Sequence, residues 1–141
     1  MRAFWIMTLI AFLAYPSASF ALSDADYEAL KKSSTIFQYA DKRLNETWKG
    51  LSKAAKKDLR KEQQQWIKSG WDQEAEEYLA KGCKRDCAYA LPALTQAAGL
   101  QAADYNSSLK DVNAAKADSF FLTEKDYEIF DTCGIKEADL P

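Results

Sequence analysis

Three cysteines, Cys83, Cys87 and Cys133, are the residues of this chain that are best suited to covalent chemistry. In an oxidising compartment, a disulfide from Cys133 to Cys83 or Cys87 would close a loop of about 50 residues and stabilise the fold by roughly 4 kcal/mol, less any strain. The four-residue spacing of Cys83 and Cys87 suits a bridge between them poorly on a regular helix, although a turn around Gly82 would permit one. We therefore predict a structural bridge from the C-terminal segment to one of the earlier cysteines, which leaves one thiol either buried or available to a partner.

A Cys-x-x-x-Cys redox pair is the functional alternative for Cys83 and Cys87, with Lys84 and Arg85 favouring the thiolate form. We favour the structural bridge because thioredoxin-like chemistry uses a shorter cysteine spacing on a βαβ scaffold. A metal site built from three cysteines is less favoured still.

The chain contains no histidine. This removes Ser–His and Cys–His nucleophile pairs and the usual zinc and copper ligands. A glycine-rich phosphate loop and a nucleophile elbow are also missing from the sequence. Hydrolysis by a pair of carboxylates stays possible, but the acidic residues fall at expected helix starts and on polar faces, where capping or solvation explains them. We predict a protein that is not an enzyme, with no catalytic residue, metal site or cofactor.

The first 21 residues have the features of a secretory signal peptide. A positive start at Arg2 precedes the apolar run 3–14, and the small residues Ser19 and Ala21 place the cut before Leu22. The apolar run is too short to cross a hydrocarbon core of roughly 30 Å as a helix, so a retained membrane anchor is the less favoured alternative. No cysteine follows the cut, which argues against a lipid anchor. We predict a periplasmic or secreted protein without membrane attachment after cleavage.

Residues 22–141 are expected to form a single helical domain, since no linker divides them. Removing Arg2 leaves 18 of the 19 basic side chains against 21 acidic ones, a net charge of −3. This balance argues against a nucleic-acid partner, because binding to phosphates needs clustered positive charge. The nearest basic run, at 53–61, is interrupted by Asp58 and is expected to form a solvated helix face.

The first half of the domain predicts a helical hairpin at about 24–81. Ser23 is a helix cap, and Leu30, Phe37, Leu44 and Leu51 recur every seven residues, which predicts one helix from about Asp24 to Gly50. A second helix is expected from about Ala54 to Lys81, with Gly82 as a left-handed stop. Because the connection between them is short, the two helices should lie antiparallel.

The second half, about 83–141, is expected to cover the apolar faces of this hairpin. A short helix is predicted over 87–98, disturbed or started by Pro92 and stopped at Gly99, and 104–116 is a further helical candidate. Thr123 and Asp126 form a capping box for a last helix that Gly134 ends. The predicted fold is therefore all-α, an antiparallel hairpin completed by two or three shorter C-terminal helices into a small bundle.

The hairpin also carries a resemblance to a known family, on residues that recur in one order: Asp41, Leu44, Asn45, Trp48, Leu59, Gln63 and Trp66. This order, over about 35–78, resembles the lysozyme inhibitor LprI-like N-terminal domain family of exported bacterial proteins. Members usually continue past the tryptophan with Arg-Asp and then a cysteine that pairs with one ahead of the first helix. Here Gly70 and Trp71 stand in the Arg-Asp neighbourhood and Glu74 or Ala75 at the cysteine, and no cysteine precedes Cys83, so that family disulfide cannot form.

The matched residues also have a purely structural interpretation. Asn45 and Gln63 are expected on facing helices, where they could bond each other, the opposite backbone or Asp41. Trp48 and Trp66 would fill the space between the helices, with direct contact to a partner as the alternative. Trp71, five residues after Trp66, is expected on another side of the helix, as an exposed partner contact or against the C-terminal half.

The resemblance implies an exported non-enzymatic binding protein that inhibits a muramidase, a lysozyme, by occluding its cleft. An acidic surface would then meet a basic enzyme, and such complementarity mainly raises the association rate. The alternative is a periplasmic structural or envelope-stress accessory protein that binds another exported protein. The sequence leaves the identity of the protein partner and the oligomeric state open.

Overall fold

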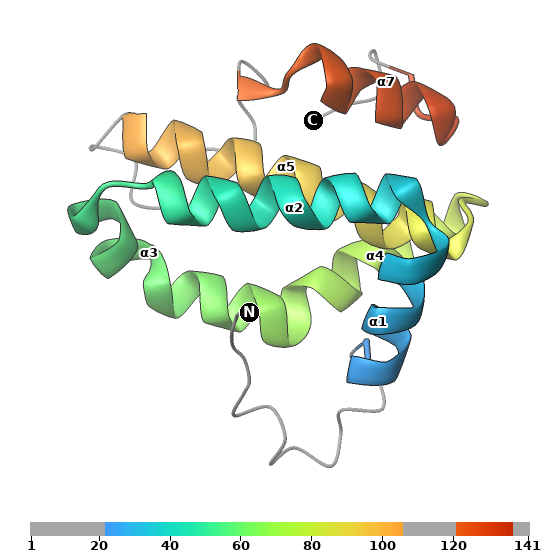
Figure 1. The fold of residues 1–141 in the computed structure, drawn as a ribbon, viewed down its shortest axis with the longest axis horizontal. Helices are drawn as coiled ribbons and strands as arrows, with labels where there is room; N and C mark the ends of the chain where they lie inside the picture. The colour runs from blue at the N-terminus through green and yellow to red at the C-terminus, as the bar shows by residue number, and fades with distance from the viewer. Residues whose placement is uncertain (1–21, 106–120, 137–141) are drawn as a thin grey trace.

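A computed structural model of the chain describes residues 22–105 and 121–136, and every regular element within them is a helix (Figure 1). The signal peptide predicted at 1–21 lies outside these residues. The elements are α1 (Asp24–Ser33), α2 (Thr35–Gly50), α3 (Lys53–Gln65), the π-helix η4 (Trp66–Gly70), α4 (Trp71–Ala80), α5 (Arg85–Tyr105) and α7 (Glu124–Thr132). The predicted all-α bundle is confirmed.

Helix α5 is the centre of the bundle. It is apolar on all sides, and nearly every residue from Cys87 to Ala103 is buried, as expected of a helix that has neighbours all round. Helix α2 packs along one side of α5 and α4 along another. The chain runs in opposite directions through α2 and through α3–η4–α4, as predicted for the hairpin, but the apolar faces of both arms meet on α5 (Figure 1).

The expected single helix at 24–50 is wrong in one respect, because the chain breaks at Ser34. The backbone of Ser34 is extended, and its hydroxyl accepts a hydrogen bond from the Phe37 amide at 3.0 Å, which caps α2. The same hydroxyl donates to the Asp86 carboxylate of α5 at 2.7 Å. Serine favours a cap over a helix interior, so the break lets α1 leave the line of α2 and pack Tyr27 and Leu30 on a second apolar cluster.

The expected short helix at 87–98 is also wrong, since α5 continues through Pro92 and Gly99 to Tyr105. Proline removes one backbone donor from a helix, and glycine lowers helix propensity. The continuous burial of this segment outweighs both penalties, and the Thr95 hydroxyl donates to the Pro92 carbonyl at 3.0 Å. The helical candidate at 104–116 lies outside the described residues except for its first two positions, which end α5.

The predicted helix ends are largely confirmed. Ser23 caps α1, and the Thr123–Asp126 capping box is complete at the start of α7. Gly82 and Gly134 have φ angles of 96° and 84°, the left-handed region that glycine adopts without strain. Local capping chemistry therefore places these boundaries well.

Two apolar clusters form the core. The larger joins α2, α3, η4, α5 and α7, and the smaller contains Phe37, Ala75, Ala88 and Tyr89 with side chains of α1 around them. Within 22–105 and 121–136, no helix is long and apolar enough to cross a membrane.

Candidate functional site

The predicted disulfide is present, and it joins Cys87 to Cys133 with the two Cα atoms 5.8 Å apart. It ties the first turn of α5 to the residue that follows α7. Cys83 is the free thiol, and it is half-buried. The alternative pairing of Cys83 with Cys87 is therefore not the one that forms. A bridge of this kind is typical of proteins in oxidising compartments.

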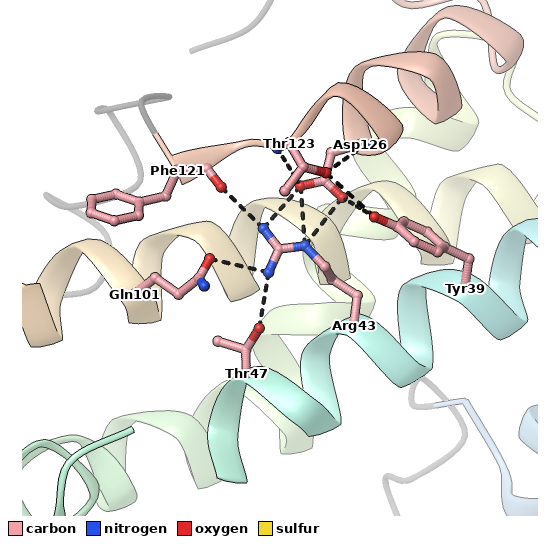
Figure 2. A network of polar contacts seen from close by, with 7 residues as sticks. All are labelled: Tyr39, Arg43, Thr47, Gln101, Phe121, Thr123 and Asp126. Atoms are coloured by element: carbon pink, nitrogen blue, oxygen red, sulfur yellow. Dashed lines mark hydrogen bonds and ion pairs between the residues drawn. The ribbon is translucent and has the colours of Figure 1, made fainter. Parts of the chain in front are cut away.

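A buried ion pair connects α2 to α7 and was not anticipated from the sequence (Figure 2). Arg43 donates from Nε and Nη2 to both carboxylate oxygens of Asp126, at 2.9–3.2 Å. It also donates to the Thr47 hydroxyl at 2.9 Å, to Gln101 Oε1 at 3.1 Å and to the Phe121 carbonyl at 3.1 Å. We call Arg43, Asp126 and these three acceptors the arginine clamp.

All five N–H groups of the Arg43 guanidinium have protein acceptors in the arginine clamp. The Asp126 side chain has no exposed surface, so the pair is desolvated, and the same carboxylate accepts from the Thr123 amide in the capping box. The pair therefore serves to position the helices, because the guanidinium has no N–H group left over for an anionic ligand. The sequence predicts that Asp126 belongs to a capping box, but not that it pairs with Arg43, which lies 83 residues away in the chain.

Tyr39 extends the arginine clamp by donating its hydroxyl to Asp126 at 2.8 Å (Figure 2). Burial raises the pKa of the Tyr39 hydroxyl, and a hydrogen bond with Thr123 works against this rise. The bond to the Asp126 carboxylate raises the pKa further, because the neutral hydroxyl is the form that donates. The hydroxyl is therefore held as a donor.

The π-helix η4 explains the two tryptophans five residues apart. In a regular α-helix, Trp66 and Trp71 would lie on different sides, which was the expectation. The amide of Trp71 bonds to the Trp66 carbonyl, and this wider turn brings both rings to one side, where they stack with centroids 4.9 Å apart. Phe37 of α2 continues the stack at 6.2 Å from Trp71. We call Phe37, Trp71 and Trp66 the aromatic stack.

The aromatic stack satisfies its polar atoms internally. The Trp71 indole donates to the Tyr89 carbonyl of α5 at 2.8 Å, and the Trp66 indole donates to Glu74 at 2.9 Å. Of the two expected locations for Trp71, the structure shows contact with the C-terminal half. Gly70 is part of this arrangement, because a Cβ there would lie 2.9 Å from the Trp66 ring.

The remaining residues of the family-like motif divide between core and surface. Leu44 and Leu59 are buried, and Trp48 is half-buried with Arg60 lying 5.9 Å over its ring. Asp41 is buried and accepts a hydrogen bond from the Tyr27 hydroxyl of α1. Leu44 and Leu59 therefore belong to the core around α5, and Asp41 ties α2 to α1.

Of the partners considered for Asn45 and Gln63, a bond between the two amides is not observed. Asn45 is exposed, while Gln63 is buried and its Oε1 accepts from Gln96 Nε2 of α5 at 2.6 Å. The reason is the central position of α5, which takes the place that the facing arm of a simple hairpin would occupy.

Two tyrosines on the inner side of α4 and α5 are held neutral. Burial raises the pKa of Tyr89, and its 2.5 Å hydrogen bond to the Asp72 carboxylate raises it further. Burial also raises the pKa of Tyr78 to about 12, with smaller contributions from the charges of Glu74, Cys83 and Glu77. The Tyr89 hydroxyl is thus held as a donor that ties α5 to α4.

The long helix α3–η4–α4 has a mainly basic first part and an acidic last part. Its first part, α3, carries five basic residues and two acidic ones, whereas α4 carries four acidic residues and no basic one. In α4, Asp72 and Glu74 are engaged on the inner side, and Glu76 and Glu77 are exposed. The exposed large apolar side chains of this helix are Ile67 and Leu79, at 38% and 40%.

Within the described part of the chain, no three His, Cys, Asp or Glu side chains are grouped so that they could hold a metal ion. Comparison with protein families, with curated proteins and with solved structures found no match for the chain.

Proposed function

We propose that the protein is an exported, non-enzymatic binding protein that recognises a basic muramidase through the outer side of α4 and inhibits it by occlusion. The observation that carries this proposal is the separation of charge along α3–η4–α4, with no basic residue in α4. The resemblance to the LprI-like family supplies the class of partner. Leu79, beside the acidic pair Glu76 and Glu77, supplies an exposed apolar contact.

A rigid support for this surface favours tight recognition, because less conformational entropy is lost on binding. The inner side of α4 is held to α5 by the Tyr89–Asp72 and Trp71–Tyr89 hydrogen bonds. The next segment of the chain is held to α7 by the Cys87–Cys133 bridge. Glu76 and Glu77 therefore project from a helix with several independent anchors.

Peptidoglycan turnover by several muramidases, measured with excess mature protein, tests the proposal. We expect inhibition by the wild-type protein and at least a roughly tenfold weaker effect for the double variant Glu76→Lys, Glu77→Lys, since charge reversal at an interface costs about 1.4 kcal/mol or more. The matched control is Lys57→Glu, Lys61→Glu, which reverses two exposed charges on α3 and should retain inhibition. Unchanged turnover with every muramidase would contradict the proposal.

Crosslinking in the periplasm followed by affinity capture separates the proposed function from its alternative. If a muramidase is recovered with the wild-type protein but not with the double variant Glu76→Lys, Glu77→Lys, the result supports inhibition. Recovery of another exported protein, with unchanged muramidase turnover, replaces it with the accessory role.

A further inference from the structure

The free thiol of Cys83 lies beside the disulfide and not in isolation. Its Sγ is 3.9 Å from the carbonyl oxygen of Cys133, one of the two bridged residues. The other bridged residue, Cys87, follows Cys83 by four residues and is the third residue of α5. Three cysteines from two distant segments therefore lie close together where α4 and α7 end and α5 begins.

We propose that Cys83 exchanges with Cys87 for the bond to Cys133, so that the protein has two interconvertible disulfide forms. The Cys83 thiolate attacks Sγ of Cys133, a new Cys83–Cys133 bond forms, and the Cys87–Cys133 bond breaks. The electron pair of the broken bond leaves on Cys87, which takes up a proton from water. One disulfide and one thiol are present before and after, so no oxidant or reductant is needed.

The loop-closure entropy of the chain hardly differs between the Cys87–Cys133 and Cys83–Cys133 bridges. They span 46 and 50 residues, and loop-closure entropy changes only slowly with length. The preference is therefore set by local contacts in the folded state, where Cys87 is bonded to Cys133 and the Cys83 Sγ lies 3.9 Å from the Cys133 carbonyl oxygen.

The surroundings of the two cysteines suit this exchange. Cys87 is the third residue of the 21-residue helix α5, so the helix N-terminus stabilises negative charge on the departing sulfur. The Asp86 carboxylate, which accepts from the Cys87 amide at 2.8 Å, opposes this effect. Cys83 lies in the short connection after Gly82, which can adjust more readily than a residue inside a helix.

The two forms differ in what α7 is tied to. In the observed form, the end of α7 is bonded to the first turn of α5. In the exchanged form it is bonded to Cys83, whose amide closes the end of α4 by donating to the Tyr78 carbonyl at 3.1 Å. The exchange would therefore move the covalent attachment of α7 from α5 to the end of α4.

Tryptic mapping of the intact oxidised protein tests the proposal, because Lys84 and Arg85 separate Cys83 from Cys87 and Lys125 and Lys136 release Cys133 on its own peptide. The disulfide forms are separated by reversed-phase chromatography at acidic pH, where exchange stops, and one form is returned to pH 8. Free thiols are then alkylated at intervals and the peptides are identified by mass spectrometry. We expect alkylated Cys87 and a Cys83–Cys133 peptide to rise together to a plateau, at a rate unchanged by dilution.

Alkylation confined to Cys83 after prolonged incubation would overturn the proposal, and a rate that falls on dilution would replace it with exchange between molecules. Cys83→Ser is the matched control, and it should keep the Cys87–Cys133 bridge with no alkylated cysteine. Cys87→Ser should form the Cys83–Cys133 bridge. If this variant does not fold, the wild-type time course still decides, because it requires no substitution.

Discussion

The arginine clamp and the aromatic stack hold the same bundle together by different kinds of interaction. The arginine clamp joins α2 to α7 through directed hydrogen bonds around one desolvated ion pair. The aromatic stack joins α2 to the long helix through ring faces, with each indole N–H bonded inside the protein.

The difference follows from how much apolar surface each element offers. Helix α7 has nine residues, of which Ile129 and Phe130 are its buried apolar ones, so hydrophobic contact alone defines its position poorly. Hydrogen bonds to a planar guanidinium are directional, and the disulfide adds a covalent restraint. The long helix offers two tryptophans whose rings bury a large apolar area, and its hydrogen bonds to α5 add to that contact. The short helix thus depends mainly on polar geometry and a covalent restraint, and the long one mainly on buried apolar area.

Breaking the arginine clamp should have the largest effect on stability. Arg43→Met leaves the Asp126 carboxylate buried without its cation, which typically costs about 3–5 kcal/mol of unfolding free energy. Urea denaturation followed by circular dichroism measures the loss. Lys42→Met is the matched control, because Lys42 is exposed and its ion pair with Glu46 is 4.0 Å long at the surface, so a change of less than about 1 kcal/mol is expected. Equal effects for the two variants would show that the clamp is not a structural anchor.

Disturbing the aromatic stack should have a smaller effect. Gly70→Ala places a Cβ 2.9 Å from the Trp66 ring, and forcing the ring aside should cost about 1–3 kcal/mol, offset in part by the better helix propensity of alanine. Near-ultraviolet circular dichroism should also change, because it reports the packing of the tryptophans. Gly50→Ala is the control, since nothing lies within 4 Å of a Cβ at that helix end. A Gly70→Ala protein as stable as Gly50→Ala would show that the close approach is unimportant.

The smallest effect is expected in the pH dependence of stability. The pKa of Tyr78 is raised in the folded state to about 12 from its ordinary value of 10, chiefly by burial. The stability contributed by the neutral hydroxyl is therefore present below pH about 10 and is lost as the pH rises through about 12. Tyr78→Phe should flatten the fall in unfolding free energy over this window, without abolishing it, because the pKa values of Tyr39 and Tyr89 are raised as well. Identical slopes for wild type and variant would contradict this assignment.

Much of the fold follows from local chemistry that can be read along the chain. Serine and threonine caps, glycines in the left-handed region and the heptad of apolar residues define most helix ends and the all-α class. The prediction of one bridge from Cys133 to the start of the C-terminal half is likewise confirmed. Each of these features depends on residues that are close in sequence or on the count of a rare residue.

The tertiary structure alone decided the rest. Pro92 and Gly99 are helix breakers by propensity, yet burial on all sides of α5 carries the helix through both. The helix widens to a π-turn at η4, where Trp66 and Trp71 stack. Packing against Phe37 and α5 favours this turn, and the period of a regular α-helix does not predict it. Arg43 can pair with Asp126 only because folding brings α7 next to α2. Propensities and caps act within a turn or two of helix, whereas these outcomes depend on which surfaces become neighbours after folding.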